Sequence, residues 1–122
     1  VLIEGKGSLK LDIEETGKHV IQMLRVQDID VEDAKLFYQA KIKTENFKGK
    51  AYLEMWVFLK DKGSFFSRGL VDPITGAVDW VTKEVPFYLK KGQNPDYIDL
   101  NLVVEGRGKV WIDDIKLLKE EY

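Results

Sequence analysis

The 122-residue chain contains no cysteine, one histidine and three prolines. Without cysteine there can be no disulfide framework, thiolate metal site or cysteine nucleophile. The one histidine, His19, has no second histidine with which to share a zinc ion, and nothing marks it as half of a serine–histidine pair. We therefore interpret His19 as a surface or strand-end residue.

The chain also lacks an excess of either charge and any apolar run long enough to span a bilayer. It carries 19 basic and 21 acidic residues, for a net charge of −2, and its lysines are scattered rather than gathered in a stripe. This balance argues against nucleic-acid binding, and the hydropathy argues against membrane insertion. The length fits one domain, 1–122, with a full core.

The chain begins Val-Leu-Ile rather than with Met. We expect a piece processed or excised from a longer protein, from which a signal segment or a first strand could be missing.

Short segments rich in Val, Ile, Phe, Tyr and Trp alternate with turn signals at fairly even spacing. This pattern predicts an all-β, antiparallel, two-sheet β-sandwich with about eight strands and little or no helix. Turns are expected at Asn46–Gly49 and Gly106–Gly108, among other places. The expected strands are 8–15, 19–27, 35–44, 50–60, 64–71, 80–89, 98–105 and 109–118.

The segment 50–60 alternates in a way that gives it aromatic residues on its second face. Leu53, Met55 and every second residue on either side of them make one apolar face. Tyr52, Glu54 and Trp56 therefore share the other face. Flat rings beside an acid can stack on the apolar faces of sugars while the acid binds hydroxyls. Equally, the same face could pack against a loop, a missing N-terminal segment or a partner domain. Arg68 and Asn101 would add polar contacts if their strands neighbour this one.

The other tryptophans have less to suggest a site. Trp80 starts a strand after a loop, and we expect it to plug the edge of the core. Trp111 is expected in the core or at the sandwich edge.

No constellation for catalysis stands out. Adjacent carboxylates occur at Glu14–Glu15, Asp113–Asp114 and Glu120–Glu121, but a glycosidase needs two carboxyl groups that face each other across a substrate. The glycines at 5–7 and 106–108 open no helix and make no phosphate loop. We therefore predict a protein that is not an enzyme.

Four segments, taken in order, resemble the galactose-binding-like jelly roll of bacterial carbohydrate-binding modules. They are an early strand, a Tyr-containing strand, a strand that starts with Asp-Trp, and a closing strand with paired aspartates. In this sequence they read Gly7–Leu11, Lys35–Lys43, Val78–Thr82 and Val110–Leu117. The closing strand, with Trp111-Ile112-Asp113-Asp114, is the most specific of the four.

The resemblance implies a two-sheet jelly roll and, in many members, a structural calcium ion held between the start of the domain and the closing strand. Asp113 or Asp114 matches the aspartate of that site. The family's other acidic ligand should precede Gly7, where this chain offers only Glu4. Without a metal, Arg107, Lys109 or backbone N–H groups would satisfy the carboxylate.

The resemblance and the aromatic face together predict a non-catalytic carbohydrate-binding-like module of a larger, secreted or otherwise extracytoplasmic protein. Its partners would be a polysaccharide or other glycan and the neighbouring domains of the parent protein. The residues expected to line the ligand face are Tyr52, Glu54, Trp56, Arg68 and Asn101. The alternative is a structural or protein–protein interaction domain that binds no sugar.

Overall fold

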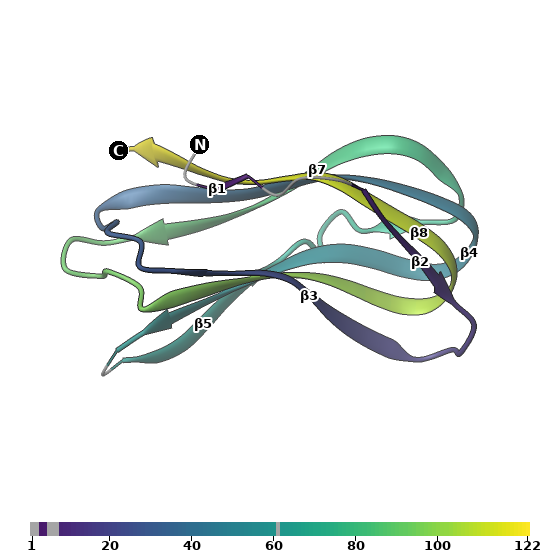
Figure 1. Cartoon of the computed structure of the whole chain (residues 1–122), viewed down its shortest axis with the longest axis horizontal. Coiled ribbons are helices and arrows are strands. Elements are labelled where there is room, and N and C mark those ends of the chain that lie inside the picture. Colours follow the sequence, from purple (N-terminus) through teal and green to yellow (C-terminus); the bar gives the residue numbers. More distant parts are fainter. Residues whose placement is uncertain (1–2, 5–7, 61) are drawn as a thin grey trace.

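A computed structural model of the chain describes residues 3–4, 8–60 and 62–122 as a two-layered sandwich of antiparallel strands (Figure 1). This confirms the predicted all-β fold. No helix occurs in the described residues, so none of them forms a helix that could cross a membrane. The strands are β1 (Ile3–Glu4), β2 (Leu9–Ile13), β3 (Lys18–Gln27), β4 (Ala34–Leu59), β5 (Gly63–Arg68), β6 (Ile74–Thr75), β7 (Val78–Leu89) and β8 (Tyr97–Glu121).

Two long strands, β4 and β8, run side by side through both layers and bend where they pass from one to the other (Figure 1). In the upper layer the first half of β4 lies between β7 and the second half of β8, and β1 pairs with the far side of β8. In the lower layer the order is β3, β8, β4, β5. The short strands β2 and β6 pair close to the bend.

The expected turns at 46–49 and 106–108 are wrong, because the chain does not reverse there. Segments 35–44 and 50–60 are one strand, and segments 98–105 and 109–118 are another. Gly49 and Gly106 face each other at the bend with positive φ angles of 131° and 140°. A Cβ on Gly49 would lie 2.0 Å from the carbonyl oxygen of Glu105, so only glycine fits this crossing.

The core fills the space between the layers, as the alternation predicts. In the lower layer the inward pairs are Leu53 with Leu102 and Met55 with Leu100. From the upper layer, Tyr38 and every second residue on either side of it in β4 complete the core. All of these side chains are buried. The opposite side of 52–58 is therefore the outer face of the lower sheet.

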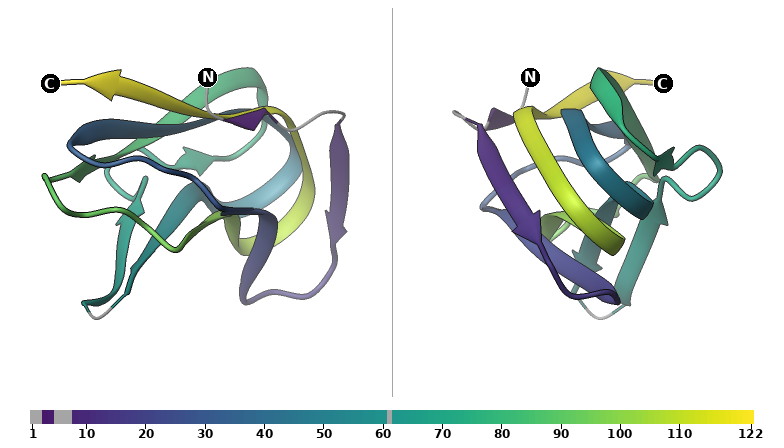
Figure 2. Two further views of the ribbon diagram at one scale, coloured as in Figure 1. Left: turned by 60° about the vertical axis from the view of Figure 1, so that its left-hand side comes forward. Right: turned by 90° about the vertical axis from the view of Figure 1, so that its right-hand side faces the viewer.

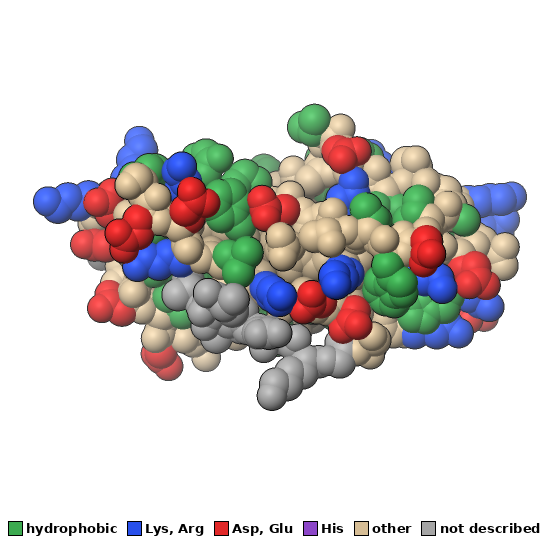
Figure 3. Space-filling view, turned by 90° about the horizontal axis from the view of Figure 1, so that it is seen from above, with side chains coloured by type: hydrophobic (Ala, Val, Ile, Leu, Met, Phe, Trp, Pro, Cys, Tyr) green, Lys and Arg blue, Asp and Glu red, His purple; other side chains and the backbone are tan. Residues whose placement is uncertain are grey.

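The outer face of the upper layer mixes Lys, Asp and Glu with separate apolar patches (Figure 3). Trp111 lies half-buried between the ammonium groups of Lys10 and Lys43, each 5.4 Å from its ring centroid. Trp80 does not plug the core edge, because it is 44% exposed on β7. Val78 and Val81, on either side of it in β7, pack against the core instead.

Candidate functional site

The outer face of the lower sheet brings the five predicted ligand-face residues together. Asn101 of β8 pairs with Glu54 of β4, which pairs on its other side with Arg68 of β5. On the same face of β4, Trp56 lies two residues after Glu54 and Tyr52 lies two residues before it. The pairing of β5, β4 and β8 therefore brings these side chains to one surface. Tyr52 and Asn101, the two that are farthest apart in the sequence, are separated by 49 positions.

Glu54 is the centre of this group. Its Oε2 accepts a hydrogen bond from Arg68 Nε at 2.6 Å, and its Oε1 accepts from Trp56 Nε1 at 2.7 Å and from Asn101 Nδ2 at 3.1 Å. Although burial alone would raise the pKa of Glu54, the bonds from Arg68, Asn101 and Trp56 outweigh it and lower the pKa below its usual range. The carboxylate is therefore ionised at neutral pH.

Glu54 is only 2% exposed, and three donors already occupy its oxygens. The sequence suggested an acid that binds sugar hydroxyls, whereas this geometry suits a carboxylate that fixes its neighbours. It holds the indole of Trp56 by the N–H and the guanidinium of Arg68 by Nε. Both side chains are thereby set in place before any ligand arrives.

Four rings lie on this surface, which we call the aromatic face: Trp56, Phe58, Phe66 and Tyr97. The Trp56 and Phe66 centroids are 5.0 Å apart with the rings tilted by 48°, and the Phe58 and Tyr97 rings stack at 4.8 Å. Phe66 is exposed, with 50% of its surface open to solvent, whereas Trp56, Phe58 and Tyr97 are each less exposed and partly buried. These rings present apolar area that is already ordered.

Each pair of rings is flanked by an arginine. Arg68 Cζ lies 4.0 Å from the Phe66 centroid, and Arg25 Cζ lies 4.3 Å from that of Tyr97. Arg25 is also bound at two points by the carboxylate of Asp99, at 2.7 and 2.9 Å. On the aromatic face each arginine thus lies against a ring, which brings charged donors next to the apolar rings.

Sequence reasoning did not select Phe66 or Tyr97 for the site. Phe66 belongs to an adjacent pair with Phe65, so one ring had to face outward, but the pattern does not say which ring meets Trp56. Tyr97 is the first residue of β8, at a strand end where alternation gives little information. Only the pairing of Tyr97 with Phe58 places it on the face.

Tyr52 lies at the other end of the face, and its ring is buried. Its hydroxyl donates to Glu105 Oε2 at 2.8 Å. Burial and this hydrogen bond raise the pKa of Tyr52 to about 12. Tyr52 therefore supports the Glu54 end of the surface and offers no ring for stacking.

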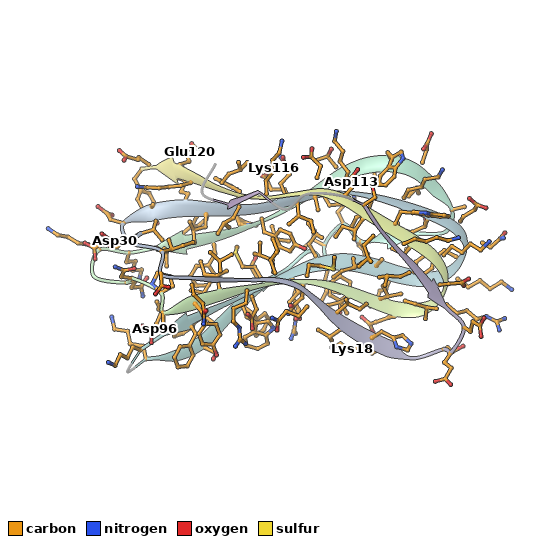
Figure 4. The ribbon with its side chains drawn as sticks, in the orientation of Figure 1. Lys18, Asp30, Asp96, Asp113, Lys116 and Glu120 are labelled. Carbon is orange, nitrogen blue, oxygen red and sulfur yellow. The ribbon has the colours of Figure 1, made fainter. Side chains whose placement is uncertain are left out.

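The two aspartates predicted to bind calcium lie on the upper layer, far along β8 from the aromatic face (Figure 4). Asp113 Oδ1 accepts the backbone N–H of Asp114 at 2.7 Å. The Asp114 carboxylate lies 3.6 Å from Lys41 Nζ and 3.4 Å from Lys116 Nζ. The backbone N–H is one of the partners expected without a metal, whereas the cations beside Asp114 are Lys41 and Lys116 rather than Arg107 or Lys109.

Calcium binding is not supported by this donor set. The described residues contain no group of three acidic or histidine side chains that could hold a metal, and two cations stand beside Asp114. The side chain of Glu4 and the residues 5–7 fall outside the description, so calcium stays a prediction from the resemblance.

The lone histidine has a local role. His19 Nε2 lies 2.9 Å from the carbonyl oxygen of Glu15, at the turn that precedes β3. This agrees with a strand-end residue.

No protein-family model and no curated protein matches this sequence. Solved structures do match the fold. A family 16 carbohydrate-binding module aligns with a TM-score of 0.56 and 15% identity, over 91% of this chain and 75% of that one. The CBM22-1 xylan-binding domain of Paenibacillus barcinonensis Xyn10C gives 0.54 and 13%, over 97% and 75%.

A cyclase from Fischerella sp. TAU aligns with a TM-score of 0.61 and 14% identity, over 96% of this chain and 65% of the cyclase. At such identities the likeness shows fold alone, and it confirms the resemblance to the β-sandwich of carbohydrate-binding modules. Because a cyclase shares the sandwich, the fold does not choose between binding and catalysis, and the site must decide.

Proposed function

We propose that this chain is a non-catalytic glycan-binding module whose ligand lies across the aromatic face. The observation that carries the proposal is that four rings are ordered and partly exposed on one sheet surface, with one of them locked by a buried carboxylate. Sugars present C–H groups on the faces of the ring and hydroxyls around its edge. A surface on which apolar rings and polar donors lie side by side is complementary to both.

The predicted residues take different parts in this proposal. Trp56 and Arg68 would touch the ligand, with Phe66 beside them. Glu54, Asn101 and Tyr52 are buried, so they would act as positioning residues beneath the contact surface. Ordering the rings in advance reduces the entropy that binding must spend.

Absence of catalysis is part of the proposal. Glu54 is the buried carboxylate nearest the rings, and three donors keep it ionised and engaged, which suits neither a general acid nor a nucleophile. Placement outside the cytoplasm, next to other domains of a parent protein, is proposed with it. It is supported only by the fold shared with carbohydrate-binding modules.

The test is calorimetric titration and a glycan array with the wild-type chain and two single variants. Phe66→Ala removes an exposed ring and keeps every residue that takes part in the Glu54 hydrogen bonds, and Trp56→Ala removes the locked ring. We expect each to weaken glycan binding at least about tenfold, the effect of about 1.4 kcal/mol. Trp80→Ala, which removes an exposed indole from the other layer, is the matched control and should bind normally.

Failure of the wild type to bind any glycan would sink the proposal. Binding that survives both ring substitutions would move the ligand to another surface.

The alternative, a structural or interaction domain, has one observation in its favour. Exposed apolar residues continue from β5 into the following loop, namely Phe65, Phe66, Leu70 and Val71. Such a strip could bury against another domain or a second copy. Sedimentation at several concentrations tests self-association, and a strict monomer argues against the second copy.

A further inference from the structure

A gap in strand pairing opens the edge of the lower sheet beside the aromatic face. The pairing of β4 with β5 ends at Glu54 and Arg68, and its pairing with β6 starts at Ala51 and Ile74. Among the described residues Tyr52 therefore has no strand partner on this side, and the Gly69 N–H donates to the carbonyl oxygen of Leu53 at 3.0 Å. The chain between β5 and β7 stands out from the side of the sandwich here (Figure 2).

A cavity of about 320 Å³ occupies this gap, with β7 of the upper layer as its far wall. That volume lies at the small end of the usual range for ligand sites, about 300–1,000 Å³. Its apolar lining comes from both layers, from Leu53 on one side and from Val85 and Pro86 on the other. Val71 stands fully exposed on the loop at its rim.

The charged lining is balanced. Arg68 and Lys83 contribute two cations, and Asp72 and Glu84 contribute two carboxylates. Lys83 Nζ donates to Asp72 Oδ2 at 2.9 Å and to its carbonyl oxygen at 3.1 Å, which ties the loop to β7. A cavity with an apolar wall, polar rim and no net charge suits a neutral polyhydroxylated ring better than a phosphate or carboxylate.

The cavity is joined to the aromatic face through shared residues. Arg68 lines the cavity, and its guanidinium lies against the Phe66 ring. Tyr52, two residues before Glu54 on β4, also lines the cavity. A chain of sugars that stacks on Trp56 and Phe66 can continue past Arg68 over the edge of β5.

We infer that the edge cavity is a second saccharide subsite, which receives one neutral sugar unit of a chain that also lies on the aromatic face. This rests on the proposed function. It gives the bound saccharide a direction, from the rings across Arg68 to the β5–β7 edge. It also predicts that the affinity depends on the number of sugar units.

The experiment is calorimetric titration of the full chain with xylo- and cello-oligosaccharides, from disaccharide to hexasaccharide. Lys83 lines the cavity from β7 and lies opposite the buried Ala40, on the inward side of the strand, so Lys83→Trp should obstruct the cavity. We expect it to weaken binding of the longest bound oligosaccharides about tenfold, the loss of one modest subsite, and to leave the shortest unchanged. Thr75→Trp, an exposed threonine outside the cavity lining, is the control.

A second variant obstructs the cavity from inside. A Cβ on Gly69 would lie 3.3 Å from Val85 Cγ1, so Gly69→Ala narrows the floor. Equal affinity of the wild type and both variants for every oligosaccharide overturns the second subsite while leaving glycan binding on the aromatic face intact. If neither oligosaccharide series binds the wild type, this saccharide inference is overturned, and the array decides the proposed function separately.

Discussion

Glu54 shows how much of the outer surface depends on one side chain. A buried carboxylate is costly unless its oxygens are hydrogen-bonded, and Glu54 meets that need with donors from three strands. The same bonds fix the Trp56 indole and the Arg68 guanidinium. Stability and the shape of the candidate site are therefore coupled at this residue.

The first prediction concerns Glu54→Gln, which keeps the shape but removes the charge. Arg68 then loses its ion partner, and an amide nitrogen replaces one of the two acceptor oxygens, so we expect the free energy of unfolding to fall by about 2 kcal/mol. Urea unfolding measures the change. Glu45→Gln, at an exposed position of the same strand, should change it by less than about 0.5 kcal/mol. Equal effects would contradict the role given to Glu54.

The second prediction is the pH dependence of that difference. Because the folded pKa of Glu54 lies below its ordinary value of 4.5, the unfolded chain takes up the proton first. The stabilisation is complete above pH 4.5 and is lost as pH falls through the folded pKa. Unfolding free energies of wild type and Glu54→Gln should therefore converge on acidification from neutral pH. A constant difference would show that the charge is not responsible.

At the scale of the strand, the bends of β4 and β8 determine the architecture. Each strand serves both layers, so the crossing at Gly49 and Gly106 connects the two halves of the core without a loop. The backbones approach so closely there that a side chain on either glycine would overlap a carbonyl group.

The third prediction compares two glycines with similar backbone angles. Gly49 has φ of 131° and Gly17 has φ of 144°, but no atom of the other described residues lies within 4 Å of a Cβ added to Gly17. Gly17→Ala should cost only the conformational strain, about 1–2 kcal/mol. Gly49→Ala adds a steric overlap and should cost about 4 kcal/mol, or prevent folding. Thermal unfolding of the two variants separates these effects, and similar melting temperatures would contradict the close approach.

The sequence predicts strands better than it predicts where they join. Alternation identifies the inward side of 50–60 correctly, because Leu53 and Met55 can only be buried on one face. It cannot distinguish a hairpin from a bend, since Asn46 and the paired glycines fit both. The site is limited in the same way: Tyr52, Glu54 and Trp56 share a face by local spacing. The burial of Glu54 depends on Arg68 and Asn101, which lie 14 and 47 residues away in the chain.

At the scale of the whole molecule, the two outer faces differ in kind. The upper face carries interspersed charges of both signs (Figure 3), whereas the lower face carries the ordered rings. The start and the closing strand of the domain meet on the upper layer, where Ile3 pairs with Leu117 and Glu4 with Lys116. The resemblance places its calcium between these same parts of the fold. Here backbone pairing already joins them.

The last prediction is the response to metal removal. Two lysines stand beside Asp114 and a backbone N–H donates to Asp113, so if these partners replace the calcium that the resemblance implies, excess EDTA should leave the melting temperature unchanged. Asp114→Asn should lower stability by no more than about 1 kcal/mol, because these lysine pairs are partly exposed. A melting temperature that falls in EDTA and recovers with added Ca²⁺ would instead establish the metal. Because such an ion would stabilise only the folded chain, its effect must also grow with Ca²⁺ concentration, which distinguishes it from a nonspecific action of the chelator.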